Sequence, residues 1–115
     1  TGFFVNDTGA SLRLVSAKLI VPIAVTAADA TAVTFTVSKR DAAGANAAVV
    51  STCTTNLAGG SLTAFLPKVL TNTVANVVIA NGFTLTALAS KAGAGTAFTA
   101  ATSQAYIEVL LEPVT

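Results

Sequence analysis

Histidine, methionine and tryptophan are absent from this 115-residue chain, and cysteine occurs once. Without histidine the chain lacks the commonest general base and the commonest metal ligand. Cys53 alone cannot form an internal disulfide, and with no histidine to activate it we interpret it as a buried structural thiol. We therefore expect no catalytic residues, no metal site and no cofactor, and we predict that the protein is not an enzyme.

Charge is scarce as well. Charged residues make up 10% of the chain, against about 25% in an average soluble domain. Six basic and five acidic residues leave a net charge of +1, without the basic cluster that typically binds nucleic acid. The apolar residues never form the run of about 18 that a membrane helix requires. We expect neither nucleic acid nor a membrane as a partner, and a surface so poor in charge favours burial in an assembly.

The few acidic residues do not form a plausible catalytic or metal site. Glu108 and Glu112 share one face of a predicted strand about 13 Å apart, at about 3.3 Å per residue, which exceeds the roughly 5–9.5 Å of glycosidase carboxylate pairs. A solvated outer face is the interpretation we favour. Asp7 and Asp29 lack the Asp-rich loop of a calcium site.

Alternation of apolar and polar residues dominates what is present. Between residues 32 and 39, Val33, Phe35 and Val37 alternate with threonine and serine, which is typical of a half-buried strand. Residues 83–87 repeat the pattern after Asn81 and Gly82, a pair typical of a tight turn. Further strands are expected at residues 3–5, 12–21, 48–54, 62–66, 74–79 and 105–111.

Two of these strands carry more detail. Neither face of 12–21 is cleanly apolar, so we expect a bulge there, or a strand covered on both faces. In 105–111 the odd-numbered residues, among them Ile107, are expected to face inward, and Tyr106, Glu108 and Leu110 outward.

Turn residues separate these runs at short intervals, which predicts about eight short strands. The fold class is therefore all-β: an antiparallel β-sandwich, jelly-roll-like, forming a single domain over residues 1–115. Its core is expected to contain Val33, Phe35, Val37, Leu85 and Ile107. Short helices over 42–48 or 63–70 are the alternative, because Ala and Leu favour them.

Two segments are candidates for contact with a partner. Phe3, Phe4 and Val5 place two aromatic rings near the start of the chain, where they either pair within the sheet or belong to a docking arm over residues 1–6. Lys39 and Arg40 end a predicted strand at a turn. They are either solvated there or contact an acidic partner.

Several segments together resemble a known family. These are residues 13–17, 25–30 and 33–44 in the first half and 81–86, 92–95 and 106–109 in the second. They are similar to small β-sandwich decoration, or cement, proteins on the capsids of tailed bacteriophages. The resemblance implies a jelly-roll-like fold, binding to the major capsid protein on the outside of the shell, and often a homotrimer. It also implies a virion location after assembly in the host bacterial cytoplasm, and brings no catalytic residues.

Two other functions remain open at this point. One is a different virion role, such as a head-fibre base, a minor capsid subunit or a tail subunit. The other is a carbohydrate-binding or adhesin-like sandwich, although sugar sites use Trp or Tyr platforms and this chain has only Tyr106. In each case we expect a structural or binding protein, most readily a homo-oligomer.

Overall fold

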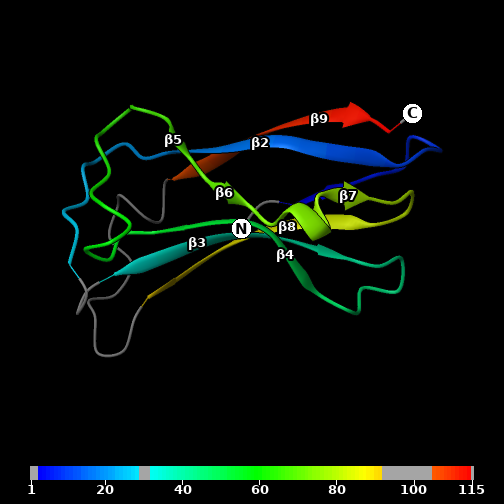
Figure 1. Cartoon of the computed structure of the whole chain (residues 1–115), viewed down its shortest axis with the longest axis horizontal. Helices are drawn as coiled ribbons and strands as arrows, with labels where there is room; N and C mark the ends of the chain where they lie inside the picture. The colour runs from blue at the N-terminus through cyan, green and yellow to red at the C-terminus, as the bar shows by residue number, and fades with distance from the viewer. Residues whose placement is uncertain (1–2, 29–31, 92–104, 115) are drawn as a thin grey trace.

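The computed structural model describes residues 3–28, 32–91 and 105–114. These residues form nine β-strands and one 3-10 helix, with no α-helix among them. The strands form two sheets in two layers (Figure 1), and all their pairings are antiparallel. The prediction of an all-β antiparallel sandwich is confirmed. Asp29 and residues 92–95 lie outside the described residues.

The first sheet, sheet A, has the strand order β1-β8-β3-β4-β6. Its strands are β1 (Phe3–Val5), β8 (Thr84–Lys91), β3 (Val33–Arg40), β4 (Ala48–Thr54) and β6 (Thr71–Asn72). β3 pairs along its whole length with β8 and along most of it with β4, so it is the central strand of this sheet.

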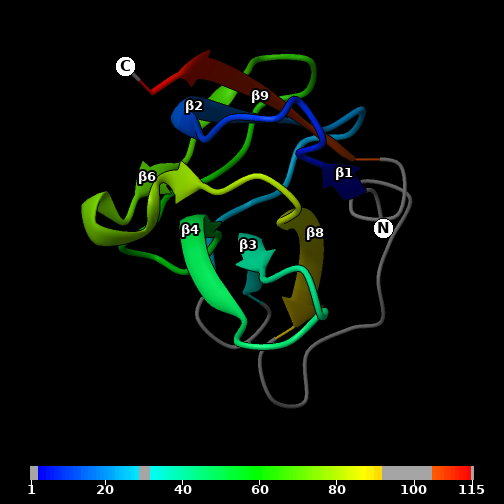
Figure 2. The same ribbon diagram turned by 90° about the vertical axis from the view of Figure 1, so that its right-hand side faces the viewer.

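The second sheet, sheet B, is built around β2 (Leu12–Ile20). One edge of β2 pairs with β9 (Tyr106–Pro113) from end to end. The other edge pairs with β7 (Val78–Ile79) near its start and with β5 (Lys68–Val69) near its end. Viewed from the end of the sandwich, β2 and β9 lie over β4, β3 and β8 (Figure 2).

The core lies between the sheets where the alternation predicted it. Val33, Phe35, Val37 and Leu85 are at most 8% exposed, as expected. Ile107 is only half-buried and packs against the core from its margin. The other members of the core are mostly aliphatic: Leu14, Ala17, Leu19, Val21, Val50, Leu62, Leu70 and Ile79.

The expected irregularity of residues 12–21 is a β-bulge at Val15. Leu14 pairs with Leu111 and Ser16 with Leu110, so Val15 has no partner in β9. The extra residue reverses which side chains face the core: Leu14 is buried before the bulge, and Ala17 and Leu19 are buried after it. Both halves of β2 therefore bury aliphatic side chains although neither face of the sequence is apolar throughout.

A second bulge lies in β4 of sheet A. Val37 pairs with Ser51 and Ser38 with Val49, which leaves Val50 without a partner in β3. Val50 and Ser51 are both fully buried. Bulges free backbone groups from the ladder between strands, and buried groups of this kind need other partners.

The chain from residue 68 to residue 79 supplies partners at both bulges. It passes from sheet B (β5) to sheet A (β6), continues through the 3-10 helix η1 (Val74–Asn76), and returns to sheet B (β7). On this path the side-chain amide of Asn72 donates to the Val15 carbonyl over 3.1 Å. The Thr73 amide donates to the Val50 carbonyl over 2.8 Å. This crossing segment ties the two sheets together along one side of the sandwich.

Two predicted strands differ from the structure. Residues 62–66 form no strand: only Leu62 pairs, in an isolated bridge with Val25. Phe65 has a φ of +60°, which breaks the extended backbone. Residues 74–79 form η1 and then the two-residue β7, because the chain has to cross between sheets there.

The two alternative helices are also absent. Residues 42–44 are in a turn, with Asp41 accepting backbone hydrogen bonds from Ala43 and Ala45, and β4 begins at Ala48. Residues 63–70 contain the left-handed Phe65, Pro67 and the start of β5.

We predict that Phe35→Ala lowers the free energy of unfolding by about 3–5 kcal/mol, because it removes a buried ring and leaves a cavity. Leu88→Ala is the matched control: Leu88 is 59% exposed on β8, and a change there is expected to stay within about 0.5 kcal/mol. Urea titrations of both variants measure the difference. Equal losses in the two variants would contradict the core described here.

We predict that Asn72→Ala lowers the free energy of unfolding by about 1–3 kcal/mol, since it leaves the buried Ser51 hydroxyl without its acceptor. Asn72 accepts from the buried Ser51 hydroxyl over 2.9 Å and donates to Val15. Asn72→Asp keeps the acceptor for Ser51 but sets a carboxylate oxygen against the Val15 carbonyl oxygen, so it should destabilise the protein as well. An alanine variant as stable as the wild type would show that the crossing segment does not depend on this link.

Candidate functional site

The N-terminal contact candidates lie in a strand. Phe3, Phe4 and Val5 form β1 and pair with β8, so this segment is an edge strand and not a free docking arm. The structure therefore agrees with the first of the two alternatives, in which this segment pairs within the sheet. Phe4 and Val5 remain 38% and 44% exposed, so as an edge strand the segment still offers apolar surface.

Asn6 explains why this segment is held in place. Its side chain is fully buried and donates to the carbonyls of Ala10 and Ile79 over 2.9 and 2.8 Å. Its backbone pairs with Phe83 and with Gly82, at the predicted tight turn, where Gly82 has a φ of +87°. A polar residue in a turn-like run gave no sign in the sequence that it would be buried.

The basic candidates Lys39 and Arg40 both have partners within the chain. The Lys39 ammonium donates to the Val78 carbonyl over 2.8 Å, and the Arg40 guanidinium to the Gly44 carbonyl over 3.2 Å. The strand register brings them close to the N-terminal candidates. Lys39 pairs with Leu85, which pairs with Phe4, and Arg40 and Val5 both pair with Thr84. The structure thus gathers these candidates at one corner of sheet A.

Asp41 organises the turn that follows them. Its carboxylate accepts from the backbone of Ala45 and Ala43 and from the Asn46 side chain, at distances of 2.7–3.0 Å. These bonds lower the pKa of Asp41, the bond from Ala45 most of all. The carboxylate therefore serves the β3–β4 turn, with its charge solvated at the surface.

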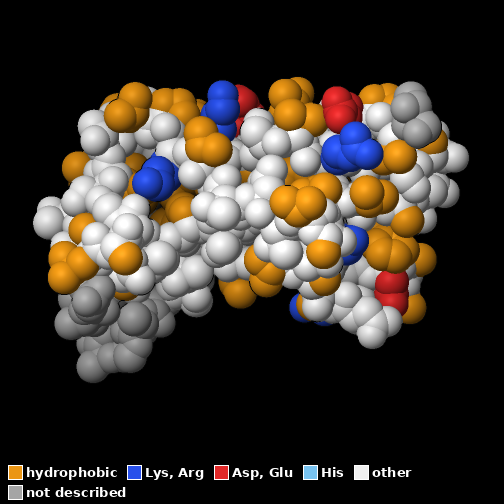
Figure 3. Space-filling model, in the orientation of Figure 1, with side chains coloured by type: hydrophobic (Ala, Val, Ile, Leu, Met, Phe, Trp, Pro, Cys, Tyr) orange, Lys and Arg blue, Asp and Glu red, His pale blue; other side chains and the backbone are white. Residues whose placement is uncertain are grey.

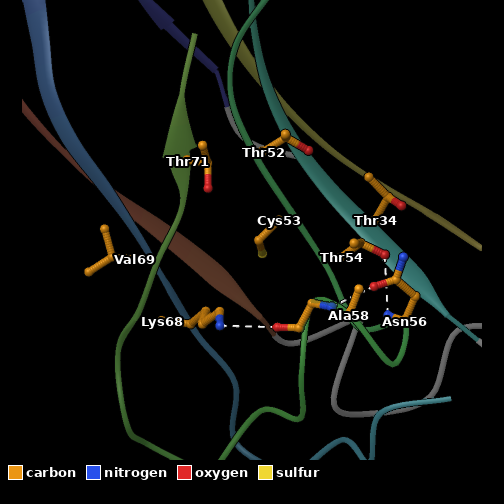
Figure 4. A pocket seen from close by; sticks show the side chains of 10 residues that line it. Thr34, Thr52, Cys53, Thr54, Asn56, Ala58, Lys68, Val69 and Thr71 are labelled. Atoms are coloured by element: carbon orange, nitrogen blue, oxygen red, sulfur yellow. Dashed lines mark hydrogen bonds between the residues drawn. The ribbon is translucent and has the colours of Figure 1, made fainter.

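A groove of about 590 Å³ lies between β4 and the β5–β6 part of the crossing segment. Figure 4 shows the side chains of Cys53 from β4, Lys68 from β5 and Thr71 from β6 along it. The remaining lining is mostly small and polar: Thr34, Thr52, Thr54, Asn56, Ala58, Gly59 and Val69. The Lys68 ammonium donates to the Gly59 carbonyl over 3.2 Å, so part of its hydrogen-bonding capacity is used within the chain.

The thiol in this groove is poorly suited to nucleophilic chemistry. Cys53 is half-buried and packs against the core. Burial raises its pKa, and the charge of Lys68 opposes this only in part. The thiol form therefore dominates at neutral pH, whereas reactive cysteines require the thiolate.

The acidic residues of β9 lie on its solvent-exposed face, as expected. Glu112 pairs with Arg13 over 3.3 Å, and both side chains are about half exposed. Glu108 lies opposite Lys18 in the strand register. No three His, Cys, Asp or Glu side chains gather into a metal-binding group within the described part of the chain. No helix in that part is long and apolar enough to cross a membrane.

Several exposed apolar side chains lie on and beside the outer face of sheet B. Figure 3 shows hydrophobic side chains along the upper margin of the molecule, interspersed with basic and acidic ones. On this face, rows with charged pairs alternate with rows that carry apolar side chains. Arg13 pairs with Glu112, Ser16 with Leu110, and Lys18 with Glu108.

Five exposed side chains surround the C-terminal end of β2, and we call them the apolar end cluster. They are 52–73% exposed: Ile23, Phe65, Leu66, Val69 and Tyr106. The Phe65 amide bonds the Val21 carbonyl over 2.8 Å, Val69 pairs with Lys18, and Tyr106 pairs with Ile20. Sequence reasoning missed this cluster because it treated 62–66 as a short strand, whereas Phe65 has a left-handed backbone.

No family model, curated protein or solved structure matches this chain.

We predict that iodoacetamide alkylates Cys53 slowly at pH 7, and that the pH midpoint of the reaction lies higher in the folded protein than in urea, because burial raises the thiol pKa. Stopped-time alkylation followed by mass spectrometry measures both midpoints. A Leu88→Cys variant on a Cys53→Ser background supplies an exposed thiol for comparison. A folded midpoint at or below the unfolded one would contradict the described environment of Cys53.

Proposed function

We propose that this chain is a non-enzymatic structural protein of a tailed-bacteriophage virion. In this proposal it acts as a decoration, or cement, protein that binds the major capsid protein on the outside of the shell and stabilises the shell. It assembles in the host bacterial cytoplasm and acts as a homo-oligomer. The observation that carries the proposal is the apolar end cluster, with Phe65 at its most exposed point.

The conformation of Phe65 supports a role in contact. A left-handed backbone costs a residue with a side chain about 1–2 kcal/mol, and Phe65 adopts it at a φ of +60°. The ring is 73% exposed, so it contributes little to the core in return. Residues kept in unfavourable backbone conformations concentrate at functional sites, and an exposed aromatic ring is typical of the anchors that dominate protein interfaces.

The rest of the surface supports the same proposal. Charged residues are only 10% of the chain, and threonine, serine and alanine occupy many of the remaining exposed positions. Short side chains lose little rotamer freedom when a partner covers them. Such a surface suits extended contacts with a large protein assembly. The sequence resemblance to decoration proteins points to a capsid as that assembly.

Phe65→Asn tests the proposal because it should change stability and binding in opposite directions. Asparagine tolerates the left-handed conformation, so the free energy of unfolding is expected to stay level or rise by up to about 1 kcal/mol. Attachment to empty shells, assembled from the major capsid protein of the same genome, should weaken about tenfold through loss of an aromatic anchor. Co-sedimentation measures attachment, and the wild-type protein should raise the melting temperature of the shells.

Leu88→Asn is the matched control, since Leu88 is similarly exposed but lies on β8 of sheet A. It should leave attachment unchanged. A wild-type protein that neither binds the shells nor raises their melting temperature would overturn the proposed function. If Phe65→Asn binds the shells as tightly as the wild type, the proposed function stands, but the contact does not involve the apolar end cluster.

A further inference from the structure

β9 is a long strand at the margin of the molecule. It runs from Tyr106 to Pro113, and within the part of the chain that the structure describes it pairs only with β2. Figures 1 and 2 show it beside β2, and the register places β5 and β7 on the opposite edge of β2. The backbone N–H and C=O groups on its other edge are therefore directed away from β2.

β9 is less protected than the other edge strands that the structure describes. Edge strands in monomeric proteins are short, bulged, interrupted by proline, covered by other segments, or carry charged side chains, lysine especially. The two charges of β9, Glu108 and Glu112, lie opposite basic residues of β2. β1 fits this description with three residues, and β5 and β7 with two each. β9 has eight residues, its bulge lies in the partner strand β2 at Val15, and Pro113 stands only at its end.

The inward face of β9 is incompletely covered. Ile107, Val109 and Leu111 face the core but are only half-buried, whereas the inward residues of the neighbouring β2 are buried almost completely. A further strand beside β9 would extend the core layer over these three side chains. Another strand with alternating apolar and polar residues could therefore pair with the backbone of β9 and cover its inward side chains.

We propose that β9 pairs antiparallel with β9 of a second copy of this chain, around a two-fold axis at Val109. The two β2–β9 pairs then form one continuous sheet. This inference goes beyond the proposed function and does not depend on capsid binding. It specifies a dimer, whereas the resemblance to decoration proteins implies a trimer.

The charges on β9 select this register. With Val109 opposite the partner's Val109, Ile107 faces the partner's Leu111 in the core layer. On the outer layer Glu108 faces the partner's Leu110, and Tyr106 faces the partner's Glu112. No carboxylate then lies directly opposite another, an arrangement that would be unfavourable.

The two neighbouring registers that keep the inward faces together are worse. A shift in one direction places Glu108 opposite the partner's Glu108. A shift in the other direction places Glu108 opposite the partner's Glu112, and Pro113 opposite the partner's Ile107. In the proposed register each glutamate also keeps its basic neighbour on β2, Lys18 for Glu108 and Arg13 for Glu112.

Substitution of Leu110 tests both the edge and the register. Sedimentation equilibrium of the wild-type protein should give the mass of a dimer. Leu110→Glu places a carboxylate opposite the partner's Glu108 twice per dimer, so the dissociation constant should rise about tenfold. Leu110→Lys loses the same apolar contact but faces Glu108 with a cation, and should bind as tightly as the wild type or more tightly. Leu88→Glu on β8 is the control and should change nothing.

Disulfide crosslinking between introduced cysteines tests the register directly, in variants that also carry Cys53→Ser. A mixture of Glu108→Cys and Leu110→Cys proteins should form the mixed disulfide dimer under mild oxidation, and neither protein alone should do so. Self-crosslinking of either variant would place the axis elsewhere and overturn the register. A monomer at all concentrations, a trimer, or a dimer indifferent to Leu110→Glu would overturn the proposal. Circular dichroism and melting of each variant separate a lost contact from a lost fold.

Discussion

The fold depends on hydrogen-bond partners for two carbonyl groups that β-bulges release from their ladders. The bulges let β2 and β4 turn additional aliphatic residues to the core, and they leave Val15 without a partner in β9 and Val50 without a partner in β3. Asn72 and Thr73 stand next to each other in the chain and donate to these two carbonyls, one in each sheet. These two bonds link both bulges to the crossing segment, and the one to the buried Val50 satisfies a backbone group that has no access to water.

This link makes the two sides of the sandwich unequal. On one side the crossing segment passes from β2 to β4 and back, and the sheets are joined by hydrogen bonds. On the other side the outermost described strands are β1 of sheet A and β9 of sheet B. β1 is short and is anchored through the buried Asn6, whereas β9 is long and regular. The asymmetry arises because the short strands β5, β6 and β7 all lie on the side where the crossing segment connects the two sheets.

Features that depend on neighbouring residues were predictable from the sequence. The alternation in β3, the turn at Gly82 and the inward and outward residues of β9 are local, and the irregularity of β2 followed from the lack of a clean apolar face. The left-handed Phe65 was not predictable, because it depends on a hydrogen bond to the distant Val21. Neither was the corner that gathers Phe4 and Lys39, since it exists only through the register of both strands with β8. The alternation of apolar and polar residues therefore predicts the strands, whereas the exposed surfaces depend on pairing between residues far apart in the sequence.

The two proposed contacts are compatible because of the direction in which β9 runs. Tyr106 belongs to the apolar end cluster and also begins β9, so each cluster lies at one end of this strand. Antiparallel pairing around Val109 places the two clusters of a dimer at opposite ends of the shared sheet. Both clusters are then free to contact neighbouring sites on a shell. Two linked contacts bind about 10²–10⁴-fold more tightly than one where the spacing allows both to engage. A small protein with few charges and one modest apolar cluster could in this way hold adjacent capsid subunits together.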